Sequence, residues 1–316
     1  MSKRLQNRVA ESRMALPAVA LYTTLVWMLC GLLTHHWWLQ FGCLAVTAYL
    51  TVLLNNVHAL IRIYSPMVSC TFLVLTCCAC FLFPSTNGAF AQLCMTACLL
   101  ILFNTYQDRQ SAGYTYYAFL FVGLASTVTP QLLFYLPLLW LLMATNLLAL
   151  SWRTWTASLL GYLTPYWIYT CWLAFQGDVT RLATPWLLMG SALSSLRMPS
   201  SLLSYPLPLL LTVAFTALLA VTGIVHYIRN SHNDKIRTRM FYYFFTAALL
   251  YTALLLLLQP QFHDLLIRLL IVFTAPLAAH FVALTSTRYT NIAFITLTSL
   301  ALLLTIYNVW AISSLF

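Results

Sequence analysis

The carboxylates, which carry much of enzyme chemistry and proton transfer, number only five in this chain of 316 residues. They are Glu11, Asp108, Asp178, Asp234 and Asp264. General acid/base catalysis, carboxylate metal sites and proton relays in membranes all need such groups. Any function that depends on carboxylate chemistry therefore has to use these five.

Several of the acids have a basic residue next to them or three or four positions later, among them Asp108 with Arg109, Asp178 with Arg181 and Asp264 with Arg268. Spacings of three and four place both side chains on one face of a helix. Local ion pairing is therefore the simplest interpretation of these acids. None of the five lies in the middle of an apolar run, which argues against a proton-coupled carrier.

Seven histidines form a second set of candidates. His35 and His36 stand in Thr34-His-His-Trp-Trp38, and paired imidazoles beside tryptophan are able to bind a ligand or a metal. An aromatic belt at the membrane surface explains the same residues, because Trp prefers that depth and His tolerates it. His280 lies late in an apolar run and is a functional candidate by its depth, with a neutral imidazole bonded to a neighbouring helix as the alternative.

Nine cysteines all fall within or at the edge of apolar runs, so we expect no disulfide framework. Cys77, Cys78 and Cys80 together with Cys94 and Cys98 form the one arrangement that resembles a thiolate cluster for copper or zinc. Their spacing matches no zinc pattern, and a thiolate is costly in apolar surroundings. We interpret them as small residues for helix packing and expect no metal and no cofactor, since phosphate-binding glycine loops and metalloprotease motifs are also missing.

The elements that must position these residues are membrane helices. Charged residues make up 6% of the chain, apolar residues 62%, and the mean hydropathy is +0.87. These values exclude a soluble protein and predict an all-α, polytopic transmembrane bundle. We count eleven apolar runs, at about residues 15–33, 41–54, 67–83, 89–103, 114–128, 132–150, 156–174, 206–227, 241–258, 265–284 and 291–312. Ten spans result if the fifth and sixth runs form one broken hairpin around Pro130.

The distribution of Lys and Arg predicts the orientation. With the N-terminus in the cytoplasm, twelve of the fifteen basic residues fall inside, as the positive-inside rule requires. Arg62, Arg229, Lys235, Arg237 and Arg239 are then candidates for contact with anionic lipid headgroups. The net charge of +10 indicates topology rather than a nucleic-acid partner. Glu11, Asp108 and Asp234 lie in the cytoplasm beside basic residues, so no acid remains for the membrane interior.

We expect a single membrane domain over residues 1–316, with a basic tail at residues 1–14 and the longest outer loop at residues 175–205. The core of that loop has apolar positions at helical spacing, typical of a segment lying in the interface. Candidate ligand-binding residues on the outer side are His35, His36, Asp178, Arg181 and Arg197. Asp178 is the one well-placed catalytic candidate, and Asp264 is a weaker second.

Three stretches in the middle third carry a family resemblance. They are Leu102 to Asp108 continuing through Gly113 and Tyr114 to Gly123-Leu-Ala-Ser126, then Pro130 to Trp140, and Ser151-Trp-Arg-Thr-Trp155 with Leu159 to Pro165. They resemble an uncharacterised family of bacterial polytopic inner-membrane proteins of about this length. The resemblance implies location in the inner membrane and about this number of spans, and it implies no particular activity.

A more distant resemblance concerns a span of Gly-x-x-x-Gly-Leu-Ala type, a proline at the outer turn, a leucine-rich span and then Trp-Arg. This order is similar to the middle of the GT-C glycosyltransferases, which use polyprenyl-phosphate sugars and typically carry an essential acid in their first extracytoplasmic loop. Here that loop, Thr34 to Gln40, holds no carboxylate. The resemblance therefore implies an enzyme that lacks its usual catalytic residue.

We expect a non-catalytic inner-membrane protein, either an accessory subunit or a handler of a lipid-like substrate in envelope biogenesis. Its partners would be membrane lipids and other inner-membrane proteins. A transporter or flippase of an uncharged or lipid-like substrate is the first alternative, which requires a polar cavity lined by Gln92, Gln131, Asn146 or His280. A GT-C-like glycosyltransferase that uses Asp178 is the second alternative.

Overall fold

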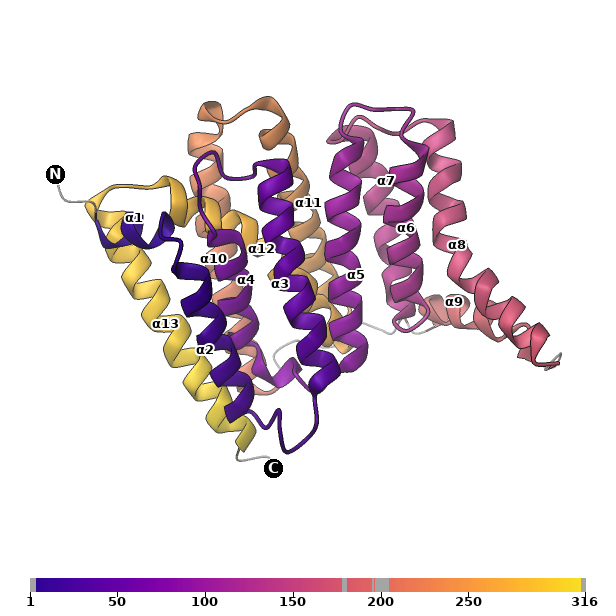
Figure 1. Ribbon diagram of the computed structural model, residues 1–316, viewed down its shortest axis with the longest axis horizontal. Helices are drawn as coiled ribbons and strands as arrows, with labels where there is room; N and C mark the ends of the chain where they lie inside the picture. The colour runs from indigo at the N-terminus through magenta and orange to yellow at the C-terminus, as the bar shows by residue number, and fades with distance from the viewer. Residues whose placement is uncertain (1–3, 178–180, 195, 197–204, 314–316) are drawn as a thin grey trace. The chain divides into compact units, whose positions relative to one another are not determined.

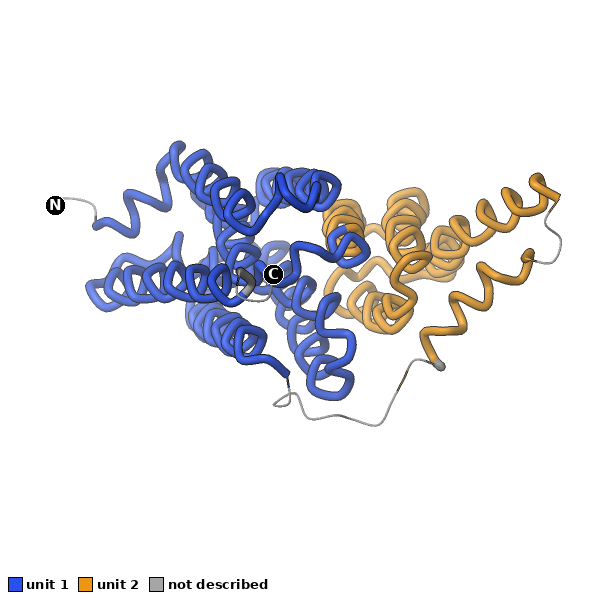
Figure 2. Tube along the Cα trace, turned by 90° about the horizontal axis from the view of Figure 1, so that it is seen from below, with its two compact units in different colours: residues 1–89, 201–316 blue, residues 90–200 orange. Residues whose placement is uncertain are grey.

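The computed structural model describes residues 4–177, 181–194, 196 and 205–313, and every regular element within them is a helix (Figure 1). The prediction of helices rather than barrel strands is confirmed for this part of the chain. Contacts among the helices divide it into two compact units, residues 1–89 with 201–316 and residues 90–200 (Figure 2). We expected one membrane domain over residues 1–316, and these contacts resolve two units within it.

Unit 1 is built around one central helix. Its elements are α1 (Leu5–Ala10), α2 (Ala15–Leu29), α3 (Trp38–His58), α4 (Met67–Cys78), the first residues of α5 (Thr86–Leu102), α10 (Leu207–Asn230), α11 (Ile236–Leu258), α12 (His263–Leu284) and α13 (Arg288–Ser313). Helix α12 packs against α1, α4, α10 and α11, and every residue from Leu265 to Ala283 is buried. Helices α2, α3 and α13 pack on α4. Helix α12 thus meets protein on all sides.

Unit 2 contains the rest of α5, α6 (Ala112–Ser126), α7 (Tyr135–Thr145), α8 (Trp152–Phe175) and α9 (Thr184–Ser194). Helix α8 begins with a capping box, in which Ser151 Oγ accepts from Thr154 N at 3.2 Å and Thr154 Oγ1 accepts from Ser151 N at 2.8 Å. It pairs with α6, and Ser126 Oγ lies 2.8 Å from Tyr166 OH across the pair. Helix α9 occupies the described part of the 175–205 segment.

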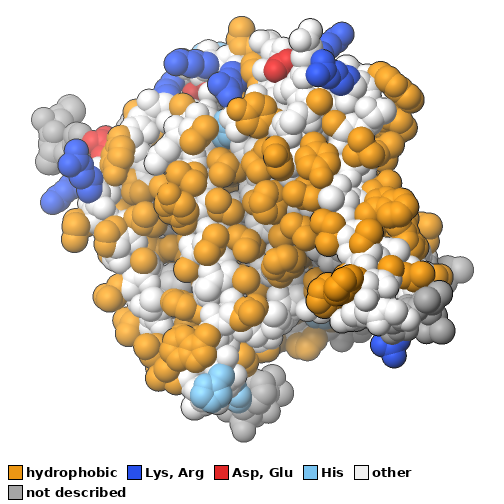
Figure 3. Space-filling view, turned by 45° about the vertical axis from the view of Figure 1, so that its right-hand side comes forward, with side chains coloured by type: hydrophobic (Ala, Val, Ile, Leu, Met, Phe, Trp, Pro, Cys, Tyr) orange, Lys and Arg blue, Asp and Glu red, His pale blue; other side chains and the backbone are white. Residues whose placement is uncertain are grey.

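Six helical segments are long and apolar enough to cross a membrane, namely Trp38–His58, Thr86–Thr105, Leu207–Asn233, Ile236–Leu258, Pro260–Leu284 and Arg288–Ala311. Shorter apolar segments are Ala15–Leu29, Met67–Cys78 and Pro130–Thr145. Hydrophobic side chains also cover most of the face in Figure 3, with Lys and Arg gathered mainly at its upper margin. The chain is therefore a helical membrane protein.

One end of unit 1 holds most of its cations, and we call it the basic end. Its cations are Arg4, Arg8, Arg13, Arg62, Arg229, Lys235, Arg237, Arg239 and Arg288. Hydrogen bonds join the segments that meet there: Arg4 donates to Ser286 O, and Arg62 Nη1 donates to Asn233 O at 3.3 Å. Arg268 lies at the opposite end, near the start of α12.

Candidate functional site

An apolar cavity opens in unit 1 among α1, α2, α4, α10, α12 and α13, and we call it the α2–α13 cavity. Its volume is about 400 Å³, within the range of about 300–1,000 Å³ common for ligand pockets. It is lined by Val9, Ser12, Met14, Ala15, Ala18, Val19, Met67, Cys70, Thr71, Val74, Leu75, Phe215, Leu219, Ala278, Val282, Phe294, Leu297, Thr298 and Ala301. Because Ala301 follows Arg288, the first residue of α13, by thirteen positions, the cavity extends about 20 Å from the basic end.

The few hydroxyl groups of this lining already have partners. Thr71 Oγ1 donates to Ala275 O at 2.9 Å, and Thr298 Oγ1 donates to Phe294 O. Ser12 Oγ accepts from Met14 N at 3.2 Å. Since these hydroxyls are satisfied locally, the wall offers hydrocarbon contact rather than hydrogen bonds, which suits an alkyl or isoprenoid chain.

Helix α1 lies at the basic end of the cavity and is fixed there by Gln6. This side chain is fully buried, and its Nε2 donates to Val282 O at 2.8 Å and to Thr285 Oγ1. The backbone N of Gln6 donates to Asn291 Oδ1 at 3.1 Å. A short helix of six residues is marginal by itself, so these bonds to α12 and α13 explain why it forms.

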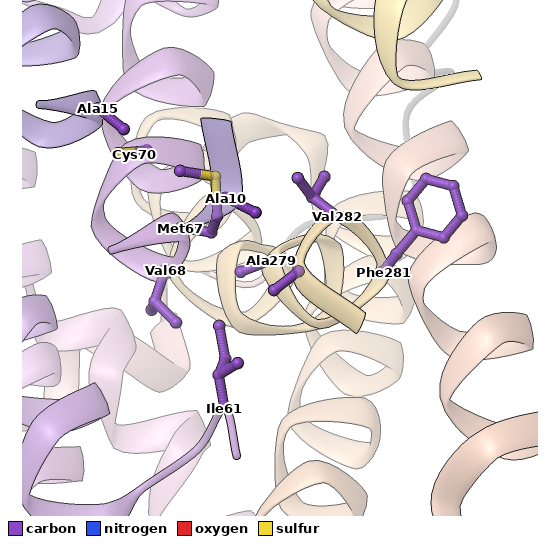
Figure 4. Packing of buried hydrophobic residues seen from close by; sticks show 10 residues of the cluster. Ala10, Ala15, Ile61, Met67, Val68, Cys70, Ala279, Phe281 and Val282 are labelled. Carbon is purple, nitrogen blue, oxygen red and sulfur yellow. The ribbon is translucent and has the colours of Figure 1, made fainter. Parts of the chain in front are cut away.

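A buried cluster shared by α1, α2, α4 and α12, with Ile61 from the α3–α4 connection, adjoins the cavity (Figure 4). Its members that also line the cavity are Ala15, Met67, Cys70 and Val282. At the basic end of the cavity, which we call its mouth, the lining residues Ser12 and Met14 are flanked in sequence by Arg8 and Arg13, whose side chains are exposed. Glu11, also exposed, is the acid of this segment. An apolar cavity with a mainly cationic mouth fits an amphiphile with an anionic headgroup.

A second apolar cavity of about 300 Å³ lies on the other side of α2, toward α3. It is lined by Leu16, Ala20, Thr23, Thr24, Phe41, Leu44, Ala45, Ala48, Tyr49, Val52 and Leu73. Between the two cavities, α2 turns large apolar side chains outward, with Leu21 65% exposed and Leu29 73% exposed. Helix α2 therefore forms a ridge with a hydrophobic hollow on each side.

Polar residues from three segments meet at the basic end of unit 1. His280 of α12 is fully buried, and its Nε2 lies 2.9 Å from Asp234 Oδ2, whose side chain is 4% exposed. Its Nδ1 lies 3.2 Å from Nδ1 of His226 in α10. Tyr227 and Tyr242 enclose the imidazole of His280, with ring centroids at 5.7 and 4.8 Å. A continuous hydrogen-bonded chain thus runs from α10 through α12 to the α10–α11 connection.

At the opposite end of unit 1, Arg268 of α12 makes the ion pair that its spacing predicts. Its Nε donates to Asp264 Oδ1 at 3.2 Å, and Nη2 donates to Leu82 O and to Ser85 O. Ser85 Oγ donates to Asp264 Oδ2 at 2.6 Å. The guanidinium is buried and the carboxylate is 34% exposed. This arrangement ties the α4–α5 connection to α12, and we interpret it as structural.

The outer candidates for ligand binding do not gather in one described site. His35 and His36 are exposed in unit 1, with the His35 ring stacked on Trp37 at 4.9 Å. Arg181 is exposed in unit 2, whereas Asp178 and Arg197 lie outside the described residues. Neither cavity is lined by His35 or His36. None of Gln92, Gln131, Asn146 and His280, the residues of the predicted polar cavity, lines either of the two cavities.

The predicted headgroup cations do share one location, because Arg62, Arg229, Lys235, Arg237 and Arg239 all belong to the basic end. Arg237 Nη2 lies 3.4 Å from Nδ1 of His58, and its guanidinium carbon lies 5.4 Å from the centre of the Phe241 ring. Arg229 and Lys235 are exposed. These cations surround the segment that holds Asp234.

The contact between Asp234 and a histidine of α12 was not predicted from the sequence. The sequence places it in a basic connection, and the structure turns its carboxylate onto His280. The sequence signal was the closeness of two titratable residues, His226 near the end of α10 and Asp234 in the short connection that follows. The cysteines carry no disulfide, and within the described part of the chain no group of three His, Cys, Asp or Glu is placed to hold a metal ion.

Comparison with known proteins gives no relative: no family model, no curated protein and no solved structure matches this chain.

Proposed function

We propose that this chain binds a membrane lipid in the α2–α13 cavity and acts as a non-catalytic lipid-handling protein of the bacterial inner membrane, in envelope biogenesis. The observation that carries the proposal is the apolar cavity that begins at an arginine-flanked mouth and extends about 20 Å along α13. The hydrocarbon core of a bilayer is about 30 Å thick, so this length accommodates a chain from one leaflet.

The residues at the mouth of the cavity indicate the charge of the lipid headgroup. Arg8 and Arg13 are exposed beside Ser12 and Met14, and each cation near a membrane surface attracts anionic lipid by about 1 kcal/mol. The cavity on the other side of α2 would hold a second chain of the same lipid. We therefore propose an anionic lipid with two hydrocarbon chains, lying astride α2.

The proposed topology places the basic end in the cytoplasm. Eleven helices would cross the membrane, namely α2 to α8 and α10 to α13, with α9 on the outer surface. The clustering of cations at one end of unit 1 supports this orientation by the positive-inside rule. The lipid would then come from the inner leaflet, whose anionic surface matches the arginines at the mouth.

Mass spectrometry of the protein purified in mild detergent tests the proposal. We expect the wild type to retain an anionic two-chain lipid, and the variants Ala18→Phe and Leu297→Trp to lose at least nine-tenths of it because the new rings occupy the cavity. Ala217→Phe on α10 is the matched control, since Ala217 is exposed and lines neither cavity. A wild type without lipid, or cavity variants that retain as much lipid as the control, would overturn the proposal.

A further inference from the structure

The chain formed by His226, His280 and Asp234 joins an accessible group to buried ones. His226 is partly exposed on α10, whereas the side chains of His280 and Asp234 are 0% and 4% exposed. The three belong to two helices and a connection, and His280 and Asp234 are 46 residues apart in sequence. An ionisable cluster of this kind within a helical membrane protein is costly to keep and is usually functional.

The hydrogen positions that satisfy these contacts are limited. If His280 donates its Nε2 hydrogen to the Asp234 carboxylate, its Nδ1 is free to accept, and His226 then donates from Nδ1. Both imidazoles are neutral in this state and the cluster has a net charge of −1. Both contacts of His280, with Asp234 and with His226, are then complete hydrogen bonds.

A second state satisfies the same contacts with one more proton. A proton from water binds Nε2 of His226, and the hydrogen on His226 Nδ1 passes to His280 Nδ1. His226 is again neutral, now with its hydrogen on Nε2, and His280 is an imidazolium paired with the Asp234 carboxylate. The Nδ1 to Nδ1 bond reverses its direction without changing its two atoms, and the net charge becomes zero. Uptake of one proton therefore costs no hydrogen bond.

The groups around the cluster favour a single exchangeable proton. Tyr227 and Tyr242 face His280 from α10 and α11, and Tyr242 OH donates to Pro276 O at 3.4 Å. Arg62 binds Asn233 O beside Asp234, which supplies a positive charge next to the carboxylate. Arg237 lies on His58 rather than on Asp234. Burial of His280 and the positive charge of Arg62 oppose uptake of a proton, and the carboxylate of Asp234 in direct contact with Nε2 favours it.

We propose that His226, His280 and Asp234 form a proton-binding site at the basic end, in which His226 receives the proton and the His280–Asp234 pair holds it. The site links α10, the α10–α11 connection and α12, which also carries Ala278 and Val282 on the wall of the α2–α13 cavity. The proposal stands independently of lipid binding, because it rests on the polar cluster alone.

Nitrogen NMR of the full chain in detergent micelles, labelled with ¹⁵N-histidine, tests this inference between about pH 5 and pH 9. Variants His226→Asn and His280→Asn assign the two signals, and His232, which is exposed, serves as the internal reference. On acidification we expect His280 to become doubly protonated while His226 stays neutral and changes its tautomer from Nδ1–H to Nε2–H. Both changes should have the same midpoint.

The variant Asp234→Asn provides a second test of the proposal by the same NMR measurement. Loss of the carboxylate should lower the midpoint of His280 by about 1 to 3 pH units, the effect of removing an opposite charge in direct contact. If this variant does not fold, the wild-type spectra decide the question. Independent titration of the two histidines, or no titration of His280 across the range, would overturn the proposal.

Discussion

The carboxylate of Asp264 lies against the backbone of Gly88 at the start of α5. A methyl group on residue 88 would lie 2.9 Å from Asp264 Cγ, nearer still to Oδ2, and 2.6 Å from Arg268 Nε. The ion pair and the start of α5 are therefore packed so tightly that any side chain at residue 88 would displace Asp264 and Arg268. The α4–α5 connection approaches α12 closely enough for Ser85 to bond with both Asp264 and Arg268 and for Leu82 O to accept from Arg268.

We expect Gly88→Ala to destabilise the protein by about 1 to 3 kcal/mol, because the added methyl group must displace a buried ion pair. Thermal unfolding in detergent measures the effect. Gly42→Ala is the control: residue 42 lies in α3 with no atom within 4 Å of the added methyl group, and alanine is the better helix former. Equal unfolding temperatures for the two variants would show that the approach at Gly88 is not tight in solution.

Substitution of Asp264 and substitution of Arg268 should lower the stability of the protein by different amounts. Asp264→Asn leaves the buried guanidinium of Arg268 without a carboxylate, and a buried charge that loses its partner is destabilising. Arg268→Met removes the buried charge and keeps most of the side-chain volume, while Asp264, 34% exposed, still reaches water and the Ser85 hydroxyl. We therefore expect Asp264→Asn to be the more damaging substitution.

The double variant completes a double-mutant cycle with the wild type and the two single variants. Arg268→Met combined with Asp264→Asn should unfold at a higher temperature than Asp264→Asn alone, because the uncompensated charge is gone. The same detergent and pH serve for all four proteins. If the double variant is less stable than both single variants, the pair does not act as the buried unit that its geometry indicates.

The ion pair also shows how far sequence alone reaches into this protein. The spacing of Asp264 and Arg268 predicts their contact, because four residues make one helical turn, and the structure confirms it at 3.2 Å. The apolar runs likewise predict helices, because continuous hydrophobicity without alternation has no other stable form in a bilayer. Local rules were sufficient in both cases.

Contacts between distant segments could not be predicted in this way. Asp234 reaches His280 only because α10 and α11 both pack on α12, and no spacing rule spans 46 residues. The central place of α12 is equally hidden, since helices that face lipid and helices that face protein are similarly apolar. The α2–α13 cavity depends on that packing, so neither it nor the proton site was available from composition or periodicity.

The proposed topology places Thr34 and His232 on opposite sides of the membrane. Thr34 is exposed in the connection between α2 and α3, and His232 is exposed in the connection between α10 and α11. We expect a membrane-impermeant maleimide to label Thr34→Cys in intact spheroplasts and to label His232→Cys only after the membrane is permeabilised. Both variants should carry Cys171→Ala, because Cys171 is the exposed native cysteine.

The labelling pattern also decides between eleven and ten spans. Seven proposed crossings, α3 to α8 and α10, separate the two positions, and an odd number puts them on opposite sides. If α6 and α7 together made one broken crossing, six crossings would remain and both cysteines would react from the same side. If only His232→Cys is labelled in intact spheroplasts, the proposed orientation is reversed. The basic end would then face outward, against the positive-inside rule.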